Sequence, residues 1–151
     1  MADLRLEELS ASNIAAANAL SLKPGQEQYV TPVSYSTAII NPATSWQRVV
    51  VDDGDGDHVV AFIQADFDPE ASSEEFRSIL WRINVDADDQ GRGIGRFAVE
   101  ALADEARRRG LDTLYVIWEP GEDGPEAFFV RTGFEPTGTT DYGDTIGKRD
   151  L

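Results

Sequence analysis

Apolar and polar positions alternate in short runs through the first half of the chain, which predicts strands with a helical region between them. Three runs are expected to be strands: residues 4–7, 46–51 and 59–67. A helix capped by Ser10 or Ser12 is expected to extend to Leu20. Residues 26–40 have an imperfect helical pattern that Pro32 interrupts. The first half is therefore expected to supply three strands and two helical segments.

In the second half, apolar residues at helical spacing follow an apolar run at 79–85. Ile94, Ala98 and Leu102 recur at i, i+4 and i+8, which predicts a helix packed on a sheet. Arginines 107–109 followed by a glycine suit the end of that helix. The remaining expected elements are a strand at 114–118, a short helix at 125–132, and a closing strand pair from residue 134 that is broken at 142–144. This order suits one mixed sheet with helices on both faces.

The segment Gln90-Gly91-Arg92-Gly93-Ile94-Gly95 lies between the predicted strand and the predicted long helix. Glycines at alternate positions allow positive φ angles and bring bare N–H groups close to a ligand, and the helix that follows adds a positive dipole end. Arg92 and Arg96 would place guanidinium groups beside those amides. The segment therefore predicts a binding site for a phosphate or pyrophosphate, and a glycine-rich turn without a ligand is the alternative.

Two common nucleotide-binding loops do not fit this segment. A Walker loop needs a lysine followed by Ser or Thr after its last glycine, and no such run occurs. A dinucleotide loop has the spacing G-x-G-x-x-G, whereas the spacing here is G-x-G-x-G. The acidic turn at 52–57 does not match a calcium loop either, because His58 and Gln64 stand where glycine and glutamate are required. We expect no metal site.

Charge and composition limit the kinds of partner and the location that we expect for the protein. The formal net charge is −15, which disfavours nucleic acid and favours a cationic partner or simply solubility. There is no cysteine, so neither a disulfide framework nor a thiolate site is possible. No apolar run approaches the roughly 20 residues of a membrane span, and Met1-Ala2-Asp3-Leu4-Arg5 does not have the basic and then apolar pattern of a signal peptide. We expect one cytoplasmic domain over residues 1–151, without membrane or nucleic-acid partners.

The glycine segment resembles the pyrophosphate loop of the GNAT acyltransferase superfamily, which binds acetyl-CoA. Four further segments, in chain order, resemble the bacterial diamine and polyamine N-acetyltransferases: Tyr35-Ser36, Leu80-Trp81-Arg82, Trp118-Glu119-Pro120 and Thr132-Gly133-Phe134. The resemblance implies an α/β GNAT fold with a single mixed, largely antiparallel twisted sheet flanked by helices. It also implies that the strands around 79–86 and 113–118 splay apart to receive the pantetheine arm of the cofactor. A homodimer is possible, since family members often dimerise.

The resemblance also assigns a cofactor site. The residues expected to bind acetyl-CoA are Ile83, Asn84, Val85, Gln90, Gly91, Arg92, Gly93, Ile94, Gly95, Arg96, Phe128 and Phe129. In many members a tyrosine four residues before the glycine of the Gly-Phe pair protonates the leaving thiolate. That position is Phe129 here, and a phenyl ring cannot donate a proton. Either the thiolate leaves unaided, or another hydroxyl such as that of Tyr142 acts, or the protein transfers acetyl groups poorly.

The residues that would deprotonate and bind the acceptor amine can be nominated only from their positions in the sequence. An alkylamine with a pKa of about 10.4 must lose a proton before it attacks, and Glu119 is the candidate base, acting directly or through water. Tyr35 and Asp66 are candidate amine-binding residues. Arg82 is expected to pair with one of these acids and position it, or to face solvent.

Together these residues predict an acetyl-CoA-dependent N-acetyltransferase. The expected acceptor is a primary amine of a small molecule, and the polyamine and diamine class is favoured. Two alternatives stay open. One is an enzyme that acetylates a protein amine, and the other is a non-catalytic module that binds or senses acyl-CoA.

Overall fold

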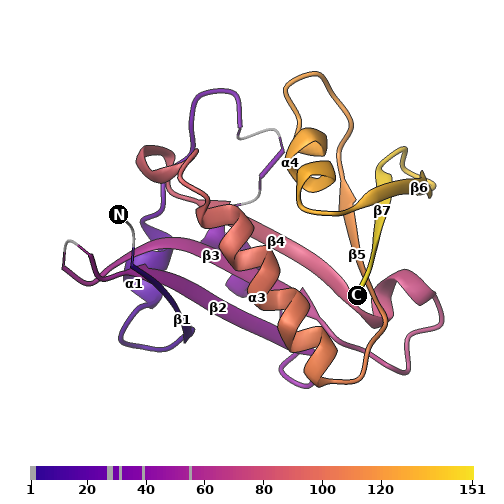
Figure 1. Cartoon of the computed structure of the whole chain (residues 1–151), viewed down its shortest axis with the longest axis horizontal. Helices are drawn as coiled ribbons and strands as arrows, with labels where there is room; N and C mark the ends of the chain where they lie inside the picture. The colour runs from indigo at the N-terminus through magenta and orange to yellow at the C-terminus, as the bar shows by residue number, and fades with distance from the viewer. Residues whose placement is uncertain (1–2, 27–28, 31, 39, 55) are drawn as a thin grey trace.

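The computed structural model describes residues 3–26, 29–30, 32–38, 40–54 and 56–151, and its centre is one twisted sheet (Figure 1). The strands are β1 (Leu4–Glu8), β2 (Ser45–Asp52), β3 (His58–Asp66), β4 (Ile79–Val85), β5 (Thr113–Trp118), β6 (Glu135–Thr139) and β7 (Thr145–Asp150). Their order across the sheet is β1-β2-β3-β4-β5-β7-β6. Every neighbouring pair is antiparallel except β4 and β5. The predicted mixed, largely antiparallel sheet is confirmed.

Helices cover both faces of the sheet. They are α1 (Ile14–Asn18), α2 (Val33–Ala38), α3 (Ile94–Arg108) and α4 (Glu126–Arg131), with short 3₁₀ turns at Glu74–Arg77 and Ala87–Asp89. The apolar side chains of α3 and α4 pack with one face, and those of α1 and α2 pack with the other. None of the helices in the described ranges is long and apolar enough to cross a membrane.

The helix α3 forms where the sequence pattern placed it. Ile94, Ala98, Leu102 and Ala106 are each at most 1% exposed and pack on the strands. Burying a side chain the size of leucine contributes about 1.5–3 kcal/mol, so this stripe fixes the helix against the sheet. The helix ends before Gly110, whose φ of +80° suits a glycine past a helix end.

The strands β4 and β5 separate soon after they meet. Their parallel pairing consists of Ile79 with Tyr115 and Leu80 with Val116, and it does not continue beyond these pairs. On its other edge, β4 stays paired with β3 to its end, with a register shift that leaves Trp81 without a partner on β3. The rest of the β4 edge that faces β5 is therefore open, as the predicted splay requires.

The first helical region differs from the sequence pattern. The helix α1 begins at Ile14 and ends at Asn18, so it is shorter than expected, and neither Ser10 nor Ser12 caps it. The preceding turn is closed by Asn13, whose amide binds the Ser10 N–H at 2.8 Å and the Glu8 carbonyl at 2.9 Å. A buried asparagine that satisfies turn atoms replaces the expected serine cap.

The expected helical segment at 26–40 is reduced to α2, which begins directly after Pro32. A proline is tolerated just before a helix but interrupts its interior, so the start of α2 follows from the ring. Residues 27–28, 31 and 39 of that segment lie outside the described residues.

Candidate active site

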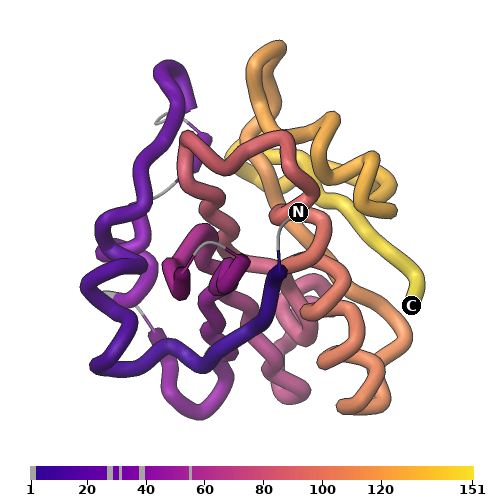
Figure 2. Tube along the Cα trace, turned by 60° about the vertical axis from the view of Figure 1, so that its left-hand side comes forward, coloured from indigo at the N-terminus to yellow at the C-terminus, as the bar shows by residue number. Residues whose placement is uncertain are grey.

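A cleft of about 1370 Å³ follows the gap between β4 and β5. It is lined by the glycine segment and α4, by Tyr29, Val30, Pro32 and Tyr35, and by residues between 139 and 146. In Figures 1 and 2, the chain near residue 25 and the β5–α4 loop rise at the same end of the molecule. These two segments meet through Tyr29, which packs against Gly121 and Gly124. The cleft thus has walls from distant parts of the chain.

The glycine segment supplies an open loop at the start of α3. Gly91 and Gly93 have φ angles of +82° and +83°, which a residue with a side chain rarely adopts. Gly95 is different, since it lies within α3 and its φ is not positive. A Cβ added there would lie 2.7 Å from the Phe128 ring, so its glycine is required by close packing against α4. The expectation that all three glycines serve backbone conformation is wrong for Gly95.

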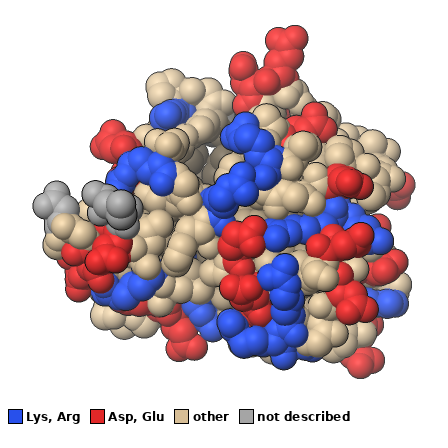
Figure 3. Space-filling view, viewed as in Figure 1, with Lys and Arg blue, Asp and Glu red and all other residues tan. Residues whose placement is uncertain are grey.

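The two arginines of the segment have different partners. Arg92 binds the Asp52 carboxylate at 2.9 Å and also pairs with Asp89, and it does not line the cleft. Arg96 does line the cleft, and its guanidinium donates to the Arg131 carbonyl at 2.8 Å. Arg131 lines the cleft too. Figure 3 shows basic side chains beside a hollow near the N-terminal end of α3. Beside the glycine segment, the cations available to an anionic ligand are therefore those of Arg96 and Arg131.

Gln90 joins the glycine segment to the N-terminal part of the chain. Its amide exchanges two hydrogen bonds of 2.9 Å with Gln26, and its Nε2 also donates to the Val85 carbonyl at 3.0 Å. Both glutamines line the cleft. These hydrogen bonds hold Gln26 against the glycine segment. Gln90 therefore fixes the position of a neighbouring cleft wall as well as lining the cleft itself.

The open edge of β4 gives the cleft its backbone donors and acceptors. Ile83 and Val85 pack toward the α3 core, and Asn84, which is 3% exposed, faces the opposite side of the sheet with its neighbour Phe62. The backbone facing β5 has no strand partner beyond Leu80. An extended ligand with amide groups fits such an edge as an added strand would. Together with the positive-φ glycines, the edge fits the pantetheine and pyrophosphate of acetyl-CoA.

Three aromatic side chains line the cleft beside this edge. Phe129 is 5% exposed, and its ring stacks on Trp118 with centroids 5.4 Å apart. Phe128 meets Phe129 edge to face at 5.3 Å. None of the three carries an acidic hydroxyl, so this wall has no proton donor at the position where the resemblance led us to look for a tyrosine.

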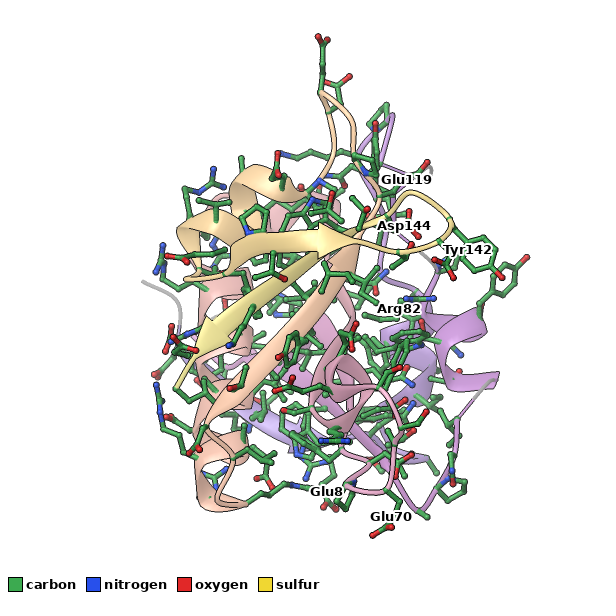
Figure 4. The ribbon with its side chains drawn as sticks, turned by 90° about the vertical axis from the view of Figure 1, so that its right-hand side faces the viewer. Glu8, Glu70, Arg82, Glu119, Tyr142 and Asp144 are labelled. Atoms are coloured by element: carbon green, nitrogen blue, oxygen red, sulfur yellow. The ribbon has the colours of Figure 1, made fainter. Side chains whose placement is uncertain are left out.

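The side chains nominated for catalysis and acceptor binding lie at the opposite rim. Glu119 follows β5 directly, Tyr142 lies in the β6–β7 turn, and Tyr35 is on α2; all three line the cleft. Figure 4 shows Glu119, Asp144 and Arg82 at one side of the molecule, while Tyr142 extends outward. Tyr142 is 93% exposed. Its hydroxyl points away from the interior of the cleft.

One nominated residue lies outside the cleft, and another lies in the cleft without an acid beside it. Asp66 ends β3 beside Ile79, accepts a hydrogen bond from the Ser45 hydroxyl at 3.1 Å, and does not line the cleft. Arg82 does line it, but no described carboxylate lies within 4 Å of its guanidinium. Of the two expectations for Arg82, pairing with an acid is not seen in the described part of the chain.

Several cleft residues carry no signal in the sequence. They are Gln26, Tyr29, Glu75, Phe76, Asp123, Arg131, Asp141 and Asp144. Most of them belong to turns or to segments that reach the cleft from elsewhere in the chain. Arg131 directly precedes Thr132-Gly133-Phe134, so its position next to that segment was the signal that could have drawn attention to it.

Comparison with known structures shows the fold. A domain from Methanocaldococcus jannaschii is similar over 100% of both chains, with a TM-score of 0.72 and 11% identity. The PaiA N-acetyltransferase from Thermoplasma acidophilum, crystallised with coenzyme A, is similar over 99% of both chains, with a TM-score of 0.71 and 12% identity. An acetyltransferase from Thermus thermophilus has 19% identity and a TM-score of 0.67 over 98% of this chain and 97% of its own.

No curated protein matches the sequence. The model of the acetyltransferase (GNAT) family matches residues 14–134, which include α1 to α4, the glycine segment and the splayed strands. The chain therefore belongs to the GNAT acetyltransferase family, whose members use acetyl-CoA as co-substrate.

Proposed function

We propose that this chain transfers the acetyl group of acetyl-CoA to a primary amine of a small molecule. The observation that carries the proposal is the continuity of the cleft. One cavity is lined by the glycine segment, by the open edge of β4 and by five acidic residues, Glu75, Glu119, Asp123, Asp141 and Asp144. A cofactor bound along β4 and a cationic amine drawn to these acids would meet between β4 and β5.

Each part of the cleft has a role in this proposal. Gly91 and Gly93 present backbone N–H groups to the pyrophosphate, and Arg96 and Arg131 add positive charge. The backbone of 83–85 pairs with the pantetheine amides. Phe128 and Phe129 supply an apolar wall beside the thioester. When bound, acetyl-CoA supplies the activated acyl group.

The reaction needs one proton removed and one returned. An alkylammonium with a pKa of about 10.4 gives a proton to Glu119 or to a water beside it, and the freed nitrogen attacks the acetyl carbonyl carbon. A C–N bond forms, the C–S bond breaks, and sulfur leaves as a thiolate. Phe129 has no proton to give, and the Tyr142 hydroxyl points outward. We therefore propose that solvent protonates the thiolate.

Polyamines and diamines are the first acceptor class to test. The resemblance in the sequence favours them, and the acidic rim supports them, because five carboxylates lower the local potential for a polycation. A protein amine is the second candidate. It is favoured only by the exposed rings of Tyr35 and Tyr142 at the mouth of the cleft, where a peptide could lie.

The test is thiol release from acetyl-CoA with spermidine, putrescine, arylalkylamines and lysine-containing peptides, with cofactor binding measured by calorimetry on the same sample. Release above the uncatalysed rate establishes the enzyme and its acceptor class. Cofactor binding without release by any amine would favour an acyl-CoA sensor instead. Absence of cofactor binding would refute the assignment of the cleft.

A further inference from the structure

Arg82 lines the cleft, and no acid among the described residues forms an ion pair with it. Its Nη1 donates to the Trp81 carbonyl at 2.7 Å, and its guanidinium carbon lies 4.9 Å from the centre of the Trp81 ring. Its Nε–H is buried and has no hydrogen-bond partner. Within the described ranges, no carboxylate lies within 4 Å of it. One of its donor groups, the buried Nε–H, is therefore unsatisfied within the described part of the protein.

Arg48 makes the same two kinds of contact as Arg82, with a backbone carbonyl and with a tryptophan ring, and it also has an acidic partner. Its Nη1 donates to the preceding carbonyl, that of Gln47, at 2.8 Å, and its guanidinium carbon lies 4.8 Å from the centre of the Trp46 ring. In addition, it forms an ion pair with Glu8 at 3.6 Å. Arg82 repeats the first two contacts and lacks the third. The chain has 28 acidic residues, so the missing carboxylate is not explained by composition.

An unpaired charge in a half-buried place is unfavourable because water is partly removed from it and nothing replaces the water. The same burial lowers the pKa of Arg82 below its ordinary value. A guanidinium is satisfied best by a planar anion that accepts two of its hydrogen bonds, as a carboxylate does. Arg82 thus has the properties of a binding group for a carboxylate that enters the cleft.

The side of the sheet on which Arg82 lies distinguishes the acceptor from the cofactor. Arg82 is opposite Gln64 on β3, in the same row as Phe62, which packs with α1 and α2. The glycine segment leads into α3, which packs on the other face. Figure 4 shows Arg82 below Asp144 and Tyr142 at the rim that also holds Glu119. An anion that reaches Arg82 therefore comes with the acceptor.

We propose that Arg82 binds a carboxylate of the acceptor, so that the substrate is a zwitterion with both an amine and a carboxylate, as in an amino acid. The inference rests on the proposed acetyl transfer to a small primary amine, and within that class it favours amines that carry a carboxylate over polyamines, which carry none. The acids at the rim attract the ammonium group, and Arg82 holds the carboxylate deeper in the cleft. A phosphate is disfavoured because its second negative charge would face the same acids.

The test compares each amino acid with its methyl ester, which keeps the amine and removes the negative charge. We would measure thiol release for wild type, Arg82→Met, Arg82→Lys and, as a control, Arg48→Met, which removes a matched arginine outside the cleft. We expect the acid to exceed its ester in kcat/KM by about tenfold or more in wild type and Arg48→Met. The ratio should approach one in Arg82→Met and lie between these values in Arg82→Lys. Cofactor affinity and circular dichroism establish that each variant is folded.

Three results would overturn the proposal while leaving the acetyltransferase activity intact. They are equal rates for acid and ester in wild type, faster turnover of putrescine than of 4-aminobutyrate, and an acid-to-ester ratio of kcat/KM that is unchanged in Arg82→Met. If no amine is acetylated, the proposed function fails, and binding decides the role of Arg82. Calorimetry with the same acid and ester pairs on coenzyme A-loaded protein should then show about a tenfold preference that Arg82→Met removes. Strong coupling between Arg82→Met and Asp144→Asn in free energy of unfolding would identify an internal ion pair and overturn the proposal.

Discussion

Phe129 stacks on Trp118 in the wall of the cleft, with ring centroids 5.4 Å apart and ring planes at 23°. The stack is closed from the other side by Phe134, whose ring meets Phe129 edge to face at 5.9 Å. The resemblance in the sequence led us to look for a tyrosine at this position, and the packing shows why a phenyl ring suits it. The ring is part of the core as well as part of the cleft.

Replacing Phe129 with tyrosine would place a hydroxyl beside the proposed thiolate. A positioned proton donor contributes about 10²–10⁴-fold, so we expect Phe129→Tyr to raise the rate of thiol release by about tenfold or more. The same hydroxyl enters a buried aromatic cluster, and we expect the free energy of unfolding to fall by about 1–3 kcal/mol. Single-turnover kinetics and urea unfolding measure the two effects.

The control for this change is Phe67→Tyr. Phe67 is also 5% exposed and lies under the Arg109 guanidinium, outside the cleft. The Phe67→Tyr variant should have a lower free energy of unfolding without a higher rate of thiol release. A folded Phe129→Tyr variant with the rate of wild type would mean that protonation of the leaving group does not limit the reaction.

Gly95→Ala tests the packing between α3 and α4. Alanine is favoured over glycine in a helix by about 1 kcal/mol, but its Cβ would lie 2.7 Å from the Phe128 ring. We expect overpacking to prevail, with a net loss of about 1–3 kcal/mol in the free energy of unfolding and a weaker cofactor affinity. Gly138→Ala, where nothing lies within 4 Å, should change stability by no more than about 0.5 kcal/mol. A more stable Gly95→Ala variant with normal cofactor binding would contradict this.

Glu119→Gln tests the proposed base. The amide keeps the shape of the side chain but cannot take a proton, so we expect kcat to fall by about 10²-fold. Cofactor affinity, measured by calorimetry, should stay near that of wild type because Glu119 lies beyond the end of β5. The control is Glu122→Gln, an exposed acid in the same loop that does not line the cleft. Equal kcat values for the two variants would remove Glu119 from the mechanism.

The sequence predicts the fold well where the apolar pattern is regular and local. The stripe on α3 and the strands β2 to β5 follow from spacing alone, because each buries side chains at a fixed period. Prediction is poorer between residues 10 and 40, where α1 is shorter than the pattern suggests. There the turn depends on Asn13, which binds the Ser10 and Glu8 backbone rather than capping the helix.

The cleft is only partly predictable, because its walls depend on distances between segments far apart in the chain. The glycine segment and the open β4 edge follow from motifs, and Gly91 and Gly93 have the expected conformation. The partners of the charged residues do not follow. Arg92 is held by Asp52, forty residues away, and Arg82 has no described acid beside it. Spacing along the chain cannot rank the 28 acids as partners for one arginine.

Asp52 connects the end of β2 to the glycine segment. Its carboxylate accepts hydrogen bonds from the Gly54 N–H at 3.0 Å, from Arg92 at 2.9 Å and from the Asp3 N–H at 3.3 Å. These bonds, the Gly54 N–H first and the Arg92 guanidinium next, lower the pKa of Asp52 from 3.8 to about 2. The carboxylate thus fixes Arg92 and, through it, the position of the loop.

The lowered pKa of Asp52 predicts how stability depends on pH. Because the folded protein holds this proton more weakly than the unfolded chain, Asp52 contributes stability above pH 4 and loses that contribution as pH falls toward 2. The difference in free energy of unfolding between wild type and Asp52→Asn should therefore be largest above pH 4 and shrink toward pH 2. Urea unfolding at half-unit pH steps measures it. A difference independent of pH for Asp52→Asn would show that the variant lost packing and not an ionised hydrogen-bond acceptor.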